Sequence, residues 1–184
     1  MREVIYVYMK EPSVHVLGPG NRYVLWVQGC HKNCKGCIAK HSHNMKEGTP
    51  IKIGALAMEI ALSDADGLTI SGGEPFLQSQ ELIELIRQIH ALRPMGVIVY
   101  TGYKIEELRK NEQAQKFLEK IDLLIDGEYI EEKNDGKSLR GSSNQRVFAL
   151  TDIYRDYLAE YGTKERKNEV FFHGPEVHEI GIPK

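Results

Sequence analysis

The sequence predicts an α/β protein with a mostly parallel sheet and crossover helices. Runs rich in β-branched and aromatic residues alternate along the chain with apolar stripes at helical spacing. Strands separated by stretches long enough for a helix usually pair in parallel, in an open sheet or in one partly closed into a barrel. The 184 residues, 41% of them hydrophobic, suffice for one core, so we expect a single domain over residues 1–184.

Four strands and three helical stretches make up the predicted series. The strands are residues 23–28, 66–71, 97–101 and 123–126, and a glycine directly follows each of them. The helical stretches are residues 53–61, 82–92 and 108–121, where apolar side chains recur on one helical face. Together they give a βαβαβαβ order.

Unusual residues follow all four predicted strands. The four strand ends are Gly29-Cys30, Gly72-Gly73-Glu74-Pro75, Thr101-Gly102-Tyr103 and Asp126-Gly127-Glu128. In parallel α/β sheets, functional groups gather where the strands end at their carboxyl edge. We therefore expect the four segments to converge on one rim of the sheet.

The charge balance excludes some classes of partner. The chain has 24 Lys and Arg residues against 26 Asp and Glu residues, a formal net charge of -2, which predicts no binding to nucleic acid or to an anionic membrane. No apolar run of about 18 residues occurs, and the first residues lack the pattern of a secretory signal. We expect a cytoplasmic protein with reduced thiols.

All three cysteines of the chain, Cys30, Cys34 and Cys37, lie close together. An odd number of thiols cannot all pair as disulfides, so a metal centre is the better interpretation. One possibility is a structural zinc site completed by His41 or His43. The other is a [4Fe-4S] cluster, in which three thiolates leave one iron without a protein ligand. Because an open metal site is where a substrate or cofactor binds, the spacing favours chemistry at a cluster.

The C-x3-C-x2-C spacing resembles the signature of the radical S-adenosylmethionine superfamily. The segment "GGEP" (72–75) looks like the strand motif of the same superfamily. The resemblance implies a truncated (βα) partial barrel in which S-adenosylmethionine is chelated by the free iron and its methionine end contacts Gly72, Gly73 and Glu74. Glycines allow close backbone approach, and a carboxylate suits a ligand ammonium. Alone, this segment also fits a tight turn with a helix-entry proline.

Within that superfamily, the chain looks most like the small activases of anaerobic ribonucleotide reductase. The similarity lies in residues 18–30, 100–103, 123–129 and 140–146, and in an ending at 181–183. It implies an enzyme that cleaves S-adenosylmethionine reductively and installs a glycyl radical on anaerobic ribonucleoside-triphosphate reductase. The implied partners are the large glycyl-radical subunit of that reductase and a flavodoxin- or ferredoxin-type electron donor.

The resemblance also suggests roles for residues away from the cysteines. By analogy with related activases, Thr101 and Asp126 would bind the cofactor carboxylate through a cation, although Asp126 also suits a turn before a glycine. The segment "RGSSNQR" (140–146) is predicted to be a loop that either receives the partner's glycine-bearing segment or shapes the cofactor pocket. Arg140 and Arg146 are the candidates for docking that partner.

One segment departs from the family pattern. After its third cysteine, the family usually has an aromatic residue and a short stretch ending in Trp, whereas this chain reads "CIAKHSHNM" (37–45) and its one Trp is Trp26. The adenine side of the pocket is therefore expected to be lined differently. Two alternatives stay open: a small radical enzyme that modifies a peptide or small molecule directly, and a zinc-binding module without activity.

Overall fold

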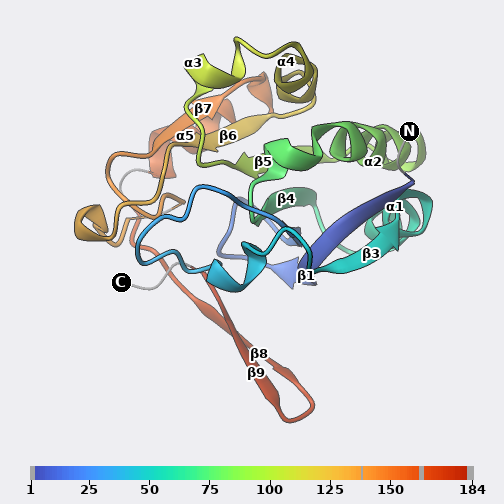
Figure 1. Ribbon diagram of the computed structural model, residues 1–184, viewed down its shortest axis with the longest axis horizontal. Coiled ribbons are helices and arrows are strands. Elements are labelled where there is room, and N and C mark those ends of the chain that lie inside the picture. The colour runs from blue at the N-terminus through green and yellow to red at the C-terminus, as the bar shows by residue number, and fades with distance from the viewer. Residues whose placement is uncertain (1–2, 138, 162–163, 182–184) are drawn as a thin grey trace.

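The computed structural model describes residues 3–137, 139–161 and 164–181 (Figure 1). The ending at 181–183 was compared above with that of the family, and residues 182 and 183 of it lie outside the described part of the chain. No helix in the described ranges is both long and apolar enough to cross a membrane.

A seven-stranded open sheet forms the centre of the molecule, in the order β3-β1-β2-β4-β5-β6-β7. Its strands are β1 Val4–Val14, β2 Arg22–Val27, β3 Thr49–Lys52, β4 Gly67–Gly72, β5 Gly96–Tyr100, β6 Leu123–Asp126 and β7 Arg146–Ala149. The strands β2, β4, β5 and β6 are parallel neighbours. Antiparallel strands extend both edges, β1 and β3 on one side and β7 on the other. The predicted α/β class is confirmed, with a parallel centre to the sheet, and the absence of a closed barrel agrees with the expected partial barrel.

Most of the helices cover one face of this sheet, and the last one packs against the other face (Figure 1). The α-helices are α1 Ile53–Leu62, α2 Ser79–Leu92, α3 Ile105–Leu108, α4 Glu112–Leu118 and α5 Arg155–Tyr161. Short 3-10 turns occur at η1 Lys40–Ser42, η2 Pro75–Gln78, η3 Glu131–Lys133 and η4 Asp152–Tyr154. The apolar stripes of α1 and α2 enter the largest core cluster, together with the strand residues that face them.

The third predicted helical stretch is two short helices. Asn111 separates α3 from α4 because its side chain accepts a hydrogen bond from the Ala114 amide at 2.9 Å, which caps the start of α4. An N-cap residue has non-helical backbone, so the helix cannot run through it. The buried side chains Leu108 and Phe117 nevertheless reach the same core.

Arg22 fixes the starts of the parallel strands. Its guanidinium is 1% exposed and donates to the Leu68 carbonyl (2.6 Å), the Gly96 carbonyl (3.0 Å) and the Thr69 hydroxyl (3.1 Å). A further bond of 2.6 Å reaches the Tyr154 hydroxyl. The beginnings of β2, β4 and β5 are thus joined through one side chain, which helps to align their ends at the opposite edge.

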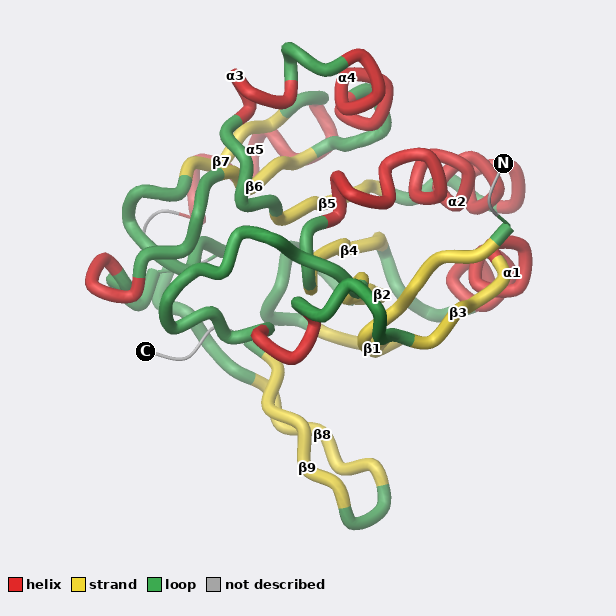
Figure 2. The backbone as a smooth tube through the Cα atoms, viewed as in Figure 1, coloured by secondary structure: helices red, strands yellow, loops and turns green. Residues whose placement is uncertain are grey.

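The last two strands form a separate hairpin that projects from the body (Figures 1 and 2). They are β8 Glu169–His173 and β9 Glu176–Ile180, paired antiparallel. At the base of the hairpin, Phe171 and Ile180 pack into a small apolar cluster that includes Trp26. Figure 2 also shows long loops gathered beside the ends of the parallel strands. The candidate site lies among those loops.

Candidate functional site

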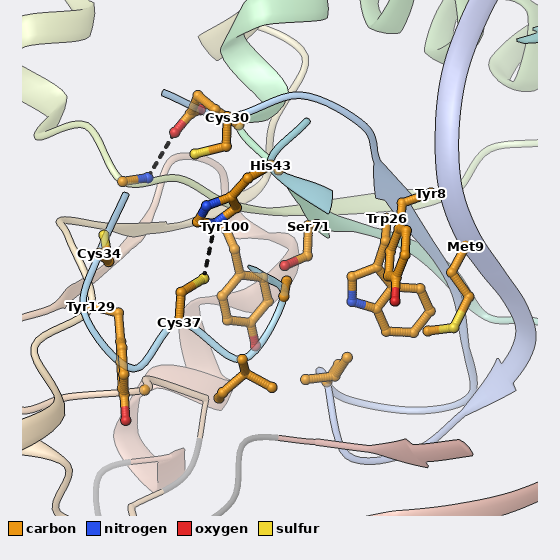
Figure 3. Close-up of a pocket in the computed structure, with 18 of the residues that line it drawn as sticks. Tyr8, Met9, Trp26, Cys30, Cys34, Cys37, His43, Ser71, Tyr100 and Tyr129 are labelled. Carbon is orange, nitrogen blue, oxygen red and sulfur yellow. Dashed lines mark hydrogen bonds between the residues drawn. The ribbon is translucent and has the colours of Figure 1, made fainter. Parts of the chain in front are cut away.

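The ends of the four parallel strands meet at one cavity of about 390 Å³ (Figure 3). Each strand end contributes to its lining: Cys30 follows β2, Gly73 and Glu74 follow β4, Thr101 follows β5 and Gly127 follows β6. The predicted convergence of the four segments is confirmed. It follows from parallel pairing, which brings the carboxyl ends of neighbouring strands to the same edge.

The three cysteines line this cavity as free, partly buried thiols. Their loop leaves β2 through Gly29, whose φ of 99° lies in the left-handed region that favours glycine. The loop returns to the strand end because the Cys30 amide donates to the His43 carbonyl at 3.0 Å. Burial raises the pKa of all three thiols. A metal centre would have to displace their protons, as thiolate ligation generally requires.

The donor set fits an iron-sulfur cluster, which is held by cysteine thiolates. Of the two histidines considered as zinc ligands, only His43 approaches a cysteine: its Nε2 lies 3.3 Å from Cys37 Sγ (Figure 3). His41 is exposed and does not line the cavity. Among the residues that the structure describes, no group of three or more His, Cys, Asp or Glu side chains is placed to hold a metal ion.

The two glycines at the end of β4, Gly72 and Gly73, line the cavity and also lie against the end of β2. A Cβ on Gly73 would lie 2.2 Å from the Gly29 carbonyl oxygen, and one on Gly72 would lie 2.6 Å from the Val27 backbone. The Gly73 and Glu74 amides donate to the Val27 and Gly29 carbonyls, each at 2.8 Å. In this structure the glycines therefore allow two strand ends to approach each other.

Glu74 is buried at the centre of a hydrogen-bond network. Its carboxylate accepts bonds from the Thr101 hydroxyl (2.8 Å), the Gly102 amide (2.9 Å) and the Phe76 amide (3.0 Å). The last of these caps η2, which begins at Pro75, so the helix-entry interpretation of "GGEP" also holds. Burial raises the pKa of Glu74. A carboxylate has about four lone-pair sites, so three bonds leave about one for a ligand in the cavity.

Thr101 and Asp126 are placed differently from each other. Thr101 lines the cavity, but its hydroxyl is already bonded to Glu74. Asp126 is not part of the lining: it is fully buried and forms two bonds with the Arg146 guanidinium, at 2.9 and 2.5 Å. It also accepts a bond from the Ile105 amide at 2.7 Å. In this structure the Asp126 carboxylate is therefore paired with Arg146 and lies outside the cavity lining.

The segment 140–146 is hydrogen-bonded to the residues that follow β6. Gln145 donates to the Gly127 carbonyl (2.7 Å) and Asn144 donates to the Glu128 carbonyl (2.8 Å). Gln145 and Gly141 also line the cavity, which agrees with the expectation that this segment shapes the pocket. The segment is not a loop throughout, because Arg146 begins β7.

Several lining residues were outside the predicted set. In the sequence, Lys32 lies between Cys30 and Cys34. Its Nζ is 3.0 Å from the Glu128 carboxylate and 4.2 Å from the centre of the Tyr103 ring. Its place in the cysteine loop was the signal that could have identified it. Tyr8 and Ile180 line the same cavity from distant parts of the chain. No local pattern marks such residues, because their placement depends on the fold.

Comparisons with known proteins agree with this geometry. The profile of the family described as "4Fe-4S single cluster domain" matches residues 16–148. A protein named anaerobic ribonucleoside-triphosphate reductase-activating protein, from Enterobacteria phage T4, is 35% identical over 147 residues, which cover 77% of this chain and 92% of the relative. Proteins of the same name from Salmonella typhimurium and Escherichia coli K12 are 35% and 34% identical, each covering 73% of this chain and 92% of the relative.

Proposed function

Because the chain belongs to the family of anaerobic ribonucleoside-triphosphate reductase-activating proteins, we propose that it installs a glycyl radical on the large subunit of such a reductase. The observation that carries the proposal is the meeting of three cysteines and one buried carboxylate in a single cavity. Possible cluster ligands and a group suited to a cofactor ammonium thereby line the same cavity.

In this proposal Cys30, Cys34 and Cys37 hold a [4Fe-4S] cluster, and S-adenosylmethionine occupies the rest of the cavity. When bound, the cluster would supply the electron that cleaves the sulfonium into methionine and a 5'-deoxyadenosyl radical, as in radical S-adenosylmethionine enzymes. The chain's own contribution is to orient the cofactor and to exclude water. The radical would remove a hydrogen atom from the partner's glycine, leaving 5'-deoxyadenosine and a glycyl radical.

The remaining acceptor site on Glu74 supports binding of the methionine ammonium. The other bonds of this carboxylate fix its orientation, since Thr101 and Gly102 hold one oxygen each. The wall formed by Trp26 and Tyr100 offers aromatic surface to the adenosine half. This arrangement replaces the aromatic segment that is missing after Cys37. No cation is required at Asp126, whose carboxylate is already paired with Arg146.

The proposed partners follow from the same reaction. A glycine on the large reductase subunit must enter the cavity, and an external carrier of the flavodoxin or ferredoxin type must deliver the electron. Arg140 is held by Asp135 at 2.5 Å and is 22% exposed, so it can contribute only part of its surface to docking. The Arg146 guanidinium already forms ion pairs with the Asp126 and Glu106 carboxylates.

The test is anaerobic reconstitution of the full chain with iron and sulfide, followed by incubation with S-adenosylmethionine, a strong reductant and the cognate reductase. We expect about four irons per chain, formation of 5'-deoxyadenosine, and a glycyl radical detected by electron paramagnetic resonance. Replacing any one of Cys30, Cys34 and Cys37 with Ala should abolish all three results.

Two outcomes would reject the proposal. Stoichiometric zinc without iron uptake would indicate a structural metal module. Formation of 5'-deoxyadenosine only when a peptide or small metabolite is added, with no radical on the reductase, would indicate direct modification of that substrate.

A further inference from the structure

His43 is held in a fixed position against the cysteine loop. Its carbonyl accepts a hydrogen bond from the Cys30 amide at 3.0 Å, and the carbonyl of Ser42 accepts one from the Gly29 amide at 2.7 Å. Its own amide donates to the Lys40 carbonyl at 3.1 Å, within η1. These bonds act on both sides of the residue's Cα, so the backbone of His43 is held next to the cysteine loop.

The ring of His43 points into the cavity and reaches one cysteine. Its Nε2 lies 3.3 Å from Cys37 Sγ, within hydrogen-bonding distance for a sulfur acceptor (Figure 3). A thiol is a weak acceptor, but an iron-bound thiolate carries negative charge, and hydrogen bonds to charged acceptors are stronger. The contact seen here would therefore be strengthened when the cysteine binds a metal.

We propose that His43 is a positioning residue whose Nε2–H donates a hydrogen bond to the Cys37 sulfur of the bound cluster, thereby raising the cluster's reduction potential. This inference rests on the proposed function, since it requires Cys37 to be a cluster ligand. Reduction adds one electron from the external donor and breaks no bond in the protein. The added negative charge is shared with the thiolates, so a donor to sulfur stabilises the reduced state more than the oxidised state.

The matched control for His43 is His41. The two histidines are two positions apart in the same segment, but His41 is exposed and does not line the cavity. Replacing either with Phe removes one imidazole and keeps an aromatic ring. Replacing His43 with Gln keeps an N–H donor of similar reach.

The experiment is a redox titration of the reconstituted full chain, without S-adenosylmethionine and without the reductase, followed by electron paramagnetic resonance of the reduced cluster. For His43→Phe we expect the equilibrium constant for one-electron reduction to fall about tenfold, which corresponds to a midpoint about 59 mV more negative. His43→Gln should recover part of the shift. His41→Phe should match the unmodified chain.

A midpoint in His43→Phe equal to that in His41→Phe would overturn the inference while leaving the cluster and the proposed function intact. Absence of a cluster from the unmodified chain would instead reject the proposed function. The unmodified protein labelled with 15N-histidine gives a second readout that does not depend on variant stability. Pulsed electron paramagnetic resonance should show a weak nitrogen coupling; a strong coupling from iron-bound nitrogen, or no coupling, would overturn the hydrogen bond.

Discussion

Replacing Arg146 with Met should destabilise the fold, because it would leave a buried carboxylate without its charged partner. The Asp126 side chain is 1% exposed, and two of its three described bonds come from Arg146. Removing one member of a buried ion pair costs about 3–5 kcal/mol. Since the Arg146 side chain is 41% exposed and partly screened by water, we expect the lower end, about 3 kcal/mol.

The assay is urea unfolding of the metal-free chain, followed by circular dichroism. In a thermal melt, about 3 kcal/mol corresponds to a fall in Tm of roughly 6–12 °C for a chain of this length. Arg87→Met is the matched control, because Arg87 makes a comparable two-bond pair with Glu84 on the surface of α2 and should lose far less. If the two variants unfold at the same urea concentration, the buried pair at Asp126 is not a major source of stability, and a docking role for Arg146 becomes the better explanation.

Three further predictions concern the strand ends and the strand starts. Gly73→Ala should prevent cluster loading, measured as iron per chain, because its Cβ would meet the Gly29 carbonyl; Gly54→Ala in α1, where the nearest atom is 3.5 Å away, should load normally. Glu74→Gln should change the pH dependence of unfolding. Burial raises the native pKa of Glu74 above the ordinary 4.5, so the stability that this group contributes is present below pH 4.5 and is lost as pH rises through the native pKa. Urea midpoints measured across this pH range should fall in the unmodified chain but not in the variant. Parallel plots of midpoint against pH for the two proteins would contradict this prediction. Arg22→Met should lower the urea midpoint much more than Tyr154→Phe, since it removes the guanidinium donors to the Leu68 and Gly96 carbonyls. Equal effects would contradict the role of Arg22.

Local sequence patterns were sufficient for the centre of the fold. The strand preceding the cysteines and those ending at Gly72, Tyr100 and Asp126 have strong β-forming residues and glycines at or near their ends, so their order and parallel pairing could be predicted. Strands β1, β3 and β7 were not predicted. The β-branched and aromatic run at the start of β1 could have indicated a strand. The short strands β3 and β7 are specified by the neighbour they join more than by their own residues.

The candidate site, like the fold, could be predicted from the sequence only in part. The cavity and the cysteines that line it could be inferred from motifs, because each motif sits at the end of a strong strand. The partners of individual side chains could not. The sequence suggested a cation site or a turn before a glycine for Asp126, and only the pairing of β6 with β7 places Arg146 opposite it. Likewise, spacing alone made His41 and His43 equivalent, whereas the fold brings only His43 to a cysteine.

The cavity takes its walls from almost the whole length of the described chain, from Tyr8 in β1 to Gly181 after β9. During synthesis the cysteine loop leaves the ribosome early, but the hairpin that supplies Ile180 is among the last segments to appear. The complete cavity therefore cannot exist on a nascent chain. Whatever delivers iron and sulfide in the cell meets either an open, solvent-accessible loop or a finished protein, and only the finished protein surrounds the cysteines with all of these walls, which reduces their exposure to oxidants.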